Sequence, residues 1–194
     1  LQELTGQEVL RSAHYGVVHY DSPDRRGIDV GLLYNTQVFQ VINSKVFELE
    51  LYDTEREDKR IYTRDQLLVT GNLAGERMHV IVNHWPSRSG GEARTRPRRM
   101  AAAALNKKIM DSILSQEPYA KIVSMGDLND DPKDKSLKKV LKTKARVEAV
   151  GLREIYNPME RMAKRGQGTL AYRDSWNLFD QILLSAAWLS KDYE

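Results

Sequence analysis

Hydrophobic residues recur at alternate positions along several short stretches of the chain, which is the pattern of strands with one buried face. In residues 46–52, Phe47, Leu49 and Leu51 fall on one side and two glutamates on the other. A glycine-bearing turn at 71–75 separates two apolar stretches and predicts a β-hairpin. The remaining apolar stretches of strand length are 28–34, 67–70, 78–84, 121–125 and 178–185.

A helical period follows the hairpin. Leu105, Ile109 and Ile113 recur every fourth residue, which predicts a helix that begins at Pro97 and ends before Pro118. Strand patterns lie on both sides of this helix in the sequence. We therefore expect an α/β fold with a mixed sheet and helices outside it.

The composition excludes several kinds of functional site but does not identify a function. The 194 residues include no cysteine, which excludes a disulfide scaffold, a thiolate zinc site and a thiol nucleophile. Without a repeat or linker, we expect residues 1–194 to form a single domain. The apolar stretches are too short for a membrane span, so we expect none. A cytoplasmic and a secreted location both stay open.

The net charge of +3 is unevenly distributed. Residues 88–99 are rich in arginine and residues 133–146 in lysine. Such patches favour phosphates and nucleic acids, although solvated surface helices carry the same residues. In the first patch, a loop with Gly90 precedes a helix start, which makes Arg88 and Arg94 candidate phosphate-binding residues.

His84 is the first candidate for chemistry. On a strand it shares a face with Val80 and Val82, and Pro86 cannot extend a central strand. His84 therefore lies at a strand end, where loops gather and ligands bind. A hydrogen-bonded histidine at the margin of the core is an equally good interpretation of this segment.

Asp127 and Asn129 follow the next apolar stretch in the sequence Gly-Asp-Leu-Asn-Asp. Two residues apart, they offer a carboxylate and an amide oxygen on one side, which suits Mg²⁺. A plain Asx turn before a helix is the alternative.

Asp180 is the third candidate. In a strand it shares a face with Leu178, Ile182 and Leu184. An ionised carboxylate among apolar neighbours is costly, so we expect a metal, a cation or hydrogen bonds to compensate it. A salt bridge at the sheet margin is the alternative.

Taken in order, four segments resemble the endonuclease/exonuclease/phosphatase superfamily, the group of deoxyribonuclease I. The resemblance implies a four-layer α/β sandwich of two packed mixed β-sheets with outer helices. It also implies hydrolysis of phosphoesters with Mg²⁺ or Mn²⁺ at the upper edge of the sandwich. The segments are RGIDVGLLY at 26–34, NHWPSR at 83–88, GDLND at 126–130 and WNLFDQI at 176–182.

The resemblance also implies a role for each residue. His84 would contact the scissile phosphate or protonate the leaving oxygen, and Asp127 would orient the attacking water. Asn129 would hold a phosphate oxygen or a metal position. Asp180 would support a metal or orient a second histidine. Asp127, Asn129 and Asp180 would thus form a partial metal site, and Arg26 would add a phosphate contact near it.

The chain departs from the family pattern at both ends. The family has an early asparagine and a metal-binding glutamate, and it ends in a Ser-Asp-His segment; we find neither pattern here. We therefore expect a fragment of a longer protein, incomplete at both ends and of doubtful activity alone. Its unpaired sheet edges would favour pairing with a second copy.

A metal-dependent nuclease or related phosphodiesterase acting on DNA or RNA is the favoured function. The basic patches support it, as do Trp85, Tyr172 and Trp176, which would stack on bases if exposed. A phosphatase or a sphingomyelinase-type phospholipase of the same fold is the rival enzyme. A non-catalytic module that binds phosphate or nucleic acid is the alternative outside enzymes.

Overall fold

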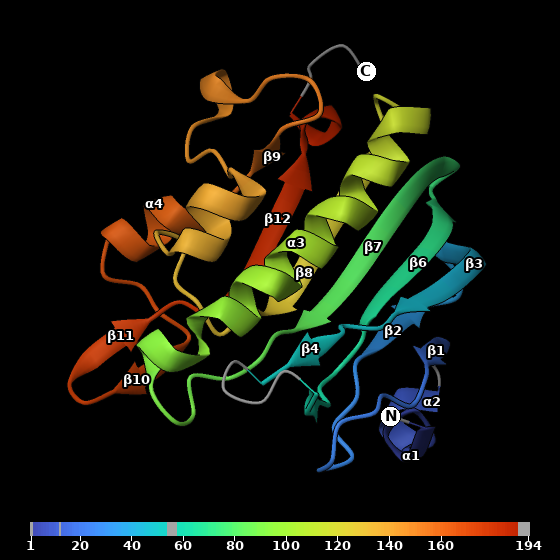
Figure 1. Ribbon diagram of the computed structural model, residues 1–194. Helices are drawn as coiled ribbons and strands as arrows, with labels where there is room; N and C mark the ends of the chain where they lie inside the picture. The colour runs from blue at the N-terminus through green and yellow to red at the C-terminus, as the bar shows by residue number, and fades with distance from the viewer. Residues whose placement is uncertain (1, 12, 54–57, 190–194) are drawn as a thin grey trace.

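The computed structural model describes residues 2–11, 13–53 and 58–189, so Leu1 and Glu194 lie outside the described residues. Its largest element is a six-stranded sheet in the order β3-β6-β7-β8-β12-β9 (Figure 1). Only the β7–β8 pair in this sheet is parallel, which confirms the expected mixed α/β fold. The strands are β3 Phe39–Phe47, β6 Gln66–Leu73, β7 Glu76–His84, β8 Lys121–Asp127, β12 Asp180–Ser185 and β9 Ile155–Tyr156.

The long helix α3 (Glu92–Gln116) crosses one face of this sheet (Figure 1). Ile81 of β7 and Leu183 of β12 pack in the same core as Ile109 and Leu114 of α3. The short π-helix η1 (Ser136–Leu141) closes this core beside α3. The residues that recur every fourth position in the sequence thus form the side of α3 that packs on the sheet.

The other face of the sheet packs against a two-stranded antiparallel sheet, β1 (Tyr15–His19) and β2 (Gly31–Asn35). Val69 and Val80 of the large sheet form a second core with Val30 and Leu32. Alternation along β7 therefore sends Ile81 to the helix side and Val80 to the β1–β2 side.

The remaining elements are short. In the described part of the chain no helix has the length and apolarity needed to cross a membrane. The remaining short elements are α1 Gln2–Thr5, α2 Glu8–Arg11, β4 Leu51–Tyr52, β5 Arg60–Ile61, η2 Val147–Ala149, α4 Met159–Lys164, β10 Leu170–Tyr172, β11 Ser175–Asn177 and η3 Ala186–Trp188.

Two sequence-based boundaries are wrong. Residues 46–52 do not form one strand: β3 ends at Phe47, and the chain turns away before β4 pairs with β5. The helix begins at Glu92 instead of Pro97, because Gly91, with a φ of 109°, marks the break before it. Pro97 lies inside the helix.

The predicted hairpin is confirmed as β6 and β7, with a tighter turn than expected. Leu73 pairs with Glu76, so only Ala74 and Gly75 form the turn. Both have positive φ, 50° and 87°, which is the type I′ geometry that matches strand twist. Gly71 is part of β6.

Strand β3 lies at one edge of the described sheet and carries an irregularity. Its pairing with β6 shifts between Val41 and Asn43. Ile42, between them, is 52% exposed. This is a β-bulge on an edge strand.

Gly126 is required where β8 passes β7. Its φ is 134°, and a Cβ at this position would lie 2.0 Å from the carbonyl oxygen of Asn83. The backbone of β7 occupies the space that any side chain would need. The position immediately precedes Asp127, so this close approach also sets the end of β8.

We expect Gly126→Ala to lower the free energy of unfolding by about 2–4 kcal/mol, because it combines a strained φ with a backbone clash. Gly75→Ala is the control, since Gly75 also has positive φ but a Cβ added there would meet nothing within 4 Å. The control should cost about 1 kcal/mol. Urea unfolding of both variants measures the difference, and equal losses would contradict the close approach.

Candidate functional site

Three of the predicted residues lie side by side on neighbouring strands. His84 at the end of β7 pairs with Asp127 at the end of β8. Asp127 in turn pairs with Asp180 at the start of β12. Side chains of directly paired residues point to the same face. We call this edge of the sheet, where β7 and β8 end and β12 begins, the site edge (Figure 1).

The imidazole of His84 faces the carboxylate of Asp127. His84 Nε2 lies 3.7 Å from Asp127 Oδ2, and both side chains are about one third exposed, 30% and 36%. Burial lowers the pKa of His84, the positive charge of Arg64 lowers it further, and the Asp127 carboxylate opposes both. The imidazole is therefore neutral at pH 7, with one ring N–H able to donate to an oxyanion.

Asn129 is fixed beside Asp127 by the Asx turn that the sequence offered as an alternative. Its backbone N–H donates to Asp127 Oδ1 at 2.8 Å, and its Nδ2 donates to the Trp85 carbonyl at 3.0 Å. Its φ of 50° is in the left-handed region that asparagine tolerates. The turn and the site are thus the same structure, because the turn is what places Asn129 next to Asp127.

Asp180 differs from its prediction. It is exposed, as is Ile182 on the same strand face, and Leu178 lies before the strand begins. The expectation that an apolar face surrounds this carboxylate is therefore wrong. Its neighbour across the strand pair is Asp127, so two carboxylates stand opposite each other. Like charges in that position repel unless a cation lies between them.

Arg64 is not among the residues predicted from the sequence. This buried guanidinium donates to Asp24 Oδ2 at 3.0 Å and to the carbonyl of Trp85 at 2.6 Å. Burial raises the pKa of Asp24, but hydrogen bonds from Arg26 and then Arg64 outweigh it and lower the pKa to about 2. Arg64 thus adds fixed positive charge behind His84. Its only sequence signal was a charged Arg64-Asp65 pair directly before an apolar stretch.

The three candidate phosphate-binding arginines have different surroundings. Arg26 is ion-paired with Asp24, its side chain 58% exposed, and it lines a pocket of about 340 Å³ that Arg64 also lines. Arg94 is exposed near the start of α3. Arg88 is held by other groups of the protein. Arg26 is linked to Arg64 through Asp24, whereas Arg88 contacts the backbone of Asn129.

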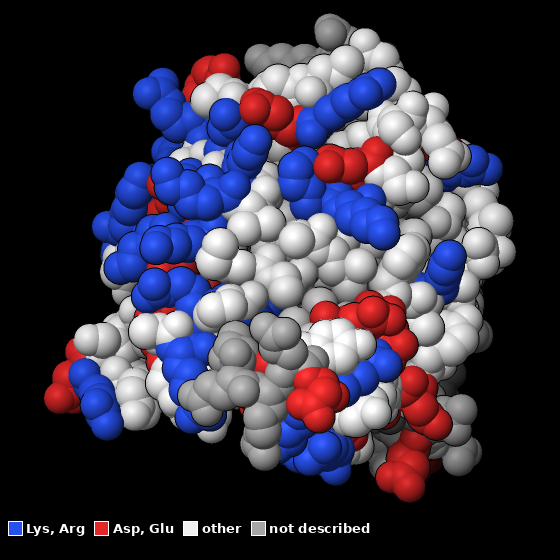
Figure 2. Space-filling model, in the orientation of Figure 1, with Lys and Arg blue, Asp and Glu red and all other residues white. Residues whose placement is uncertain are grey.

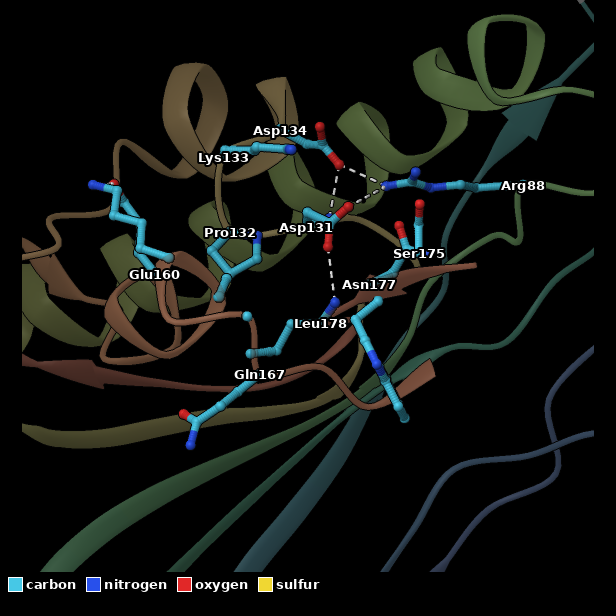
Figure 3. A pocket seen from close by; sticks show the side chains of 14 residues that line it. Arg88, Asp131, Pro132, Lys133, Asp134, Glu160, Gln167, Ser175, Asn177 and Leu178 are labelled. Carbon is cyan, nitrogen blue, oxygen red and sulfur yellow. Dashed lines mark hydrogen bonds and ion pairs between the residues drawn. The ribbon is translucent and has the colours of Figure 1, made fainter. Parts of the chain in front are cut away.

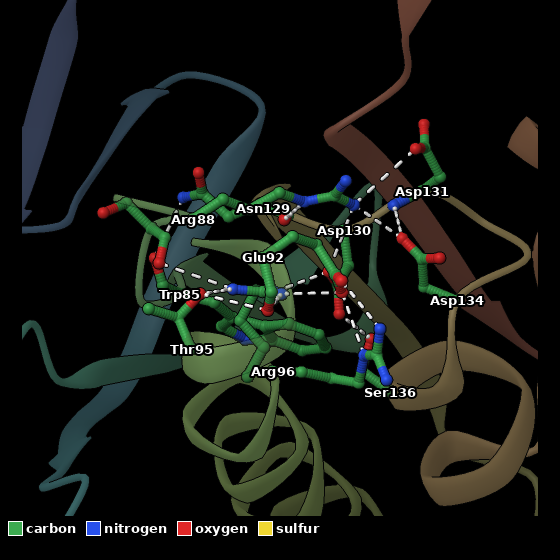
Figure 4. A network of polar contacts seen from close by, with 12 residues as sticks. Trp85, Arg88, Glu92, Thr95, Arg96, Asn129, Asp130, Asp131, Asp134 and Ser136 are labelled. Atoms are coloured by element: carbon green, nitrogen blue, oxygen red, sulfur yellow. Dashed lines mark hydrogen bonds and ion pairs between the residues drawn. The ribbon is translucent and has the colours of Figure 1, made fainter. Parts of the chain in front are cut away.

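Arg88 belongs to a dense polar network (Figure 4). Its Nε donates to the carbonyl of Asn129 at 2.8 Å, and one terminal nitrogen donates to Asp134 at 2.6 Å. Its guanidinium also lies 4.4 Å from the centroid of the Phe179 ring. Acidic neighbours therefore already neutralise the charge of Arg88, which makes it a positioning residue for the Asn129 loop.

Asp130 is the centre of this network (Figure 4). Its carboxylate accepts hydrogen bonds from Arg99 Nε at 2.5 Å, Ser136 Oγ at 2.6 Å and Arg88 at 3.2 Å. The Arg99 and Asp130 side chains are 0% and 1% exposed. The loop after β8 is thereby tied to both α3 and η1.

The lysine-rich segment is mostly a solvated surface. Figure 2 shows Lys and Arg side chains gathered on the side of the molecule that carries η1 and α4. Lys138 is paired with Glu160 and Lys144 with Glu154. The exposed lysines of this segment are Lys133, Lys135, Lys139 and Lys142.

One further group of possible metal ligands lies near the end of β1. His19, Asp21 and Asp29 offer ligand atoms that all lie within 4.8 Å of one another. His84, Asp127 and Asp180 do not form so compact a group among the described residues. A cation at the site edge would therefore keep part of its water shell, as Mg²⁺ commonly does.

The three aromatic residues named for base stacking divide into two kinds. Trp85 is 1% exposed, and its indole N–H donates to Asn83 Oδ1 at 3.1 Å, so it cannot stack on a base. Tyr172 and Trp176, on the β10–β11 hairpin, are 59% and 64% exposed.

Solved structures share this fold at low sequence identity. They include the catalytic domain of human Nocturnin with bound sulfate (16% identity, TM-score 0.60, covering 93% of this chain and 64% of that one). TDP2 of D. rerio complexed with a single-strand DNA product gives 16% identity and a TM-score of 0.56, over 97% and 67% of the two chains. A mannosyl-6-phosphatase of Bacteroides thetaiotaomicron gives 14% identity and a TM-score of 0.57, over 94% and 67%.

The chain thus spans a little under two thirds of the Nocturnin chain. A search of curated protein sequences finds no match. The sequence does match a family model along residues 1–194, and the mixed sheet agrees with the fold that its members share. The chain belongs to the endonuclease/exonuclease/phosphatase family.

Proposed function

We propose that this chain carries the phosphate-contacting part of a divalent-metal-dependent phosphoesterase, a nuclease or related phosphodiesterase. The observation that supports this most is the register that aligns His84, Asp127 and Asp180 on three adjacent strands. Three polar side chains at paired positions at the end of apolar strands form a site that could receive an anion and a cation together.

The donor set at the site edge fits a hard divalent cation. Asp127 and Asp180 stand opposite each other, and the one ion-pair partner recorded for Asp127 among the described residues is His84, whose lowered pKa leaves it neutral. Together with the amide oxygen of Asn129, the two carboxylates would hold Mg²⁺ or Mn²⁺. When bound, such an ion spreads the charge that develops on phosphoryl oxygens.

The protein groups supply positioning and proton handling. Asp127 has one oxygen fixed by the Asn129 N–H and the other facing His84, so it can orient an attacking water. His84, neutral at rest, would contact a phosphoryl oxygen, and the negative charge of the bound phosphate would raise its pKa. A raised pKa makes the imidazole a better proton donor for the leaving oxygen.

Arg64 contributes positive charge near His84. It is buried against Asp24 and the Trp85 carbonyl, so it acts on the site through its charge rather than by contact with substrate. That charge attracts a phosphate, which offsets the repulsion from Asp127 and Asp180.

Asp127→Asn and His84→Ala should each lower metal-dependent hydrolysis of single-stranded DNA at least about 100-fold, because each removes a group that acts on the reacting atoms. Cleavage of a labelled oligonucleotide by the full-length protein, with saturating Mg²⁺ or Mn²⁺, measures the effect. Asp111→Asn is the control, since Asp111 is exposed on α3 and paired with Lys107. If both site variants retain wild-type rates, the proposal fails.

The protonation of His84 gives a separate check. The Asp127 carboxylate favours the imidazolium form, so Asp127→Asn should move the pKa of His84 further below its ordinary value. The imidazole proton shifts in an NMR pH titration report this pKa directly. Asp180→Asn should change it less, since Asp180 is not among the groups with the largest effect on it. A higher pKa of His84 in the Asp127→Asn variant would contradict a carboxylate at Asp127 that stabilises the imidazolium.

A further inference from the structure

A groove with a volume of about 680 Å³ opens beside the site edge. Asn129 contributes to its wall, so the groove reaches the residue that the Asx turn holds next to Asp127. One side is formed by the loop that precedes α3, including Gly90 and Gly91, and by Glu92, the first residue of the helix. The other side is the β10–β11 hairpin, which lies near the start of α3 (Figure 1).

The hairpin side of the groove presents flat and apolar groups. Leu170 and Tyr172 line it and are 46% and 59% exposed, and Phe179 also contributes to the lining. The guanidinium of Arg173 lies 5.2 Å from the centroid of the Tyr172 ring. Two amide side chains, Asn129 and Asn177, supply donors and acceptors within reach of the same space.

The combination of apolar, aromatic and amide groups in the groove favours some classes of ligand over others. An acyl chain would offer no hydrogen-bonding group to Arg173 or to the Asn177 amide. A polyphosphorylated ring would need several free cations, whereas Arg88 is already neutralised by Asp130 and Asp134. A planar base has apolar faces that stack on aromatic rings and polar edges that match amides.

A second pocket, which Asn177 of the same hairpin also lines, has a different character (Figure 3). Its volume is about 590 Å³, and Trp176 lines it while Tyr172 does not. Charged side chains of both signs line its walls: Asp131, Asp134 and Glu160, and Arg88, Lys133 and Lys164. The two exposed aromatic residues of one hairpin therefore face different environments.

We propose that the Tyr172 groove binds an unpaired base of single-stranded nucleic acid next to the phosphate at His84 and Asp127. This inference rests on the proposed function and specifies its substrate. The base stacks on the Tyr172 ring, and the Asn177 side chain contacts its edge. A duplex is disfavoured as the occupant, because neighbouring bases already cover both faces of each base in it.

The test compares binding of two fluorescent probes, a dT oligomer and an abasic oligomer of equal length, in Ca²⁺ without turnover. Tyr172→Ala should weaken binding of the dT oligomer by about 5- to 100-fold and leave the abasic oligomer unchanged. Tyr172→Phe should keep wild-type affinity, because the ring is retained. Trp176→Ala is the matched control on the same hairpin and should stay within about twofold of wild type.

The outcomes separate this inference from the proposed function. Equal affinity of wild type and Tyr172→Ala for the dT oligomer would overturn the base-binding role, as would an equal loss for both probes. If wild type prefers the dT oligomer through Tyr172 but cleaves no oligonucleotide with Mg²⁺ or Mn²⁺, the groove stands and the hydrolase proposal fails. If cleavage is intact without any base preference, the groove proposal alone fails.

Discussion

The buried ion pair between Arg99 and Asp130 holds the site together. Both charges are removed from water, and loss of either partner would leave the other uncompensated at a cost of about 3–5 kcal/mol. Asn129 and Asp131 flank Asp130 in the chain, so the pair also fixes them. Asp131 accepts a hydrogen bond from the backbone of Leu178, which extends the connection to the start of β12. One ion pair thereby links α3, the loop after β8 and the third strand of the site edge.

Local patterns predicted the strands that carry the site. The apolar rows ending at His84 and Asp127 required only nearest-neighbour alternation, and their ends place both residues at one edge. Arg64 and Asp24 are separated by forty positions, and neither lies in a motif. Their pairing depends on how loops from the two faces of the sheet meet, which no local period encodes. The contact between Arg64 and Asp24 is therefore seen in the structure and is not predictable from the sequence pattern.

Burial was the other limit of sequence analysis. Alternation placed Asp180 on one face with apolar residues and implied that this face is buried, yet Ile182 on that face is 43% exposed. The aromatic residues show the same limit. The sequence left the exposure of Trp85 open; in the structure its ring is buried, and its carbonyl accepts hydrogen bonds from both Arg64 and Asn129. Sequence gives the direction of a side chain relative to its neighbours, whereas exposure depends on what packs above it.

The bulge in β3 has a consequence for how copies of the molecule meet. A straight edge strand presents evenly spaced N–H and C=O groups, which invite lateral growth into fibrils. The shift between Val41 and Asn43 interrupts that spacing near the middle of the strand. A straight strand from another molecule would lose its hydrogen-bond alignment at this point, so the bulge acts as a built-in safeguard against aggregation.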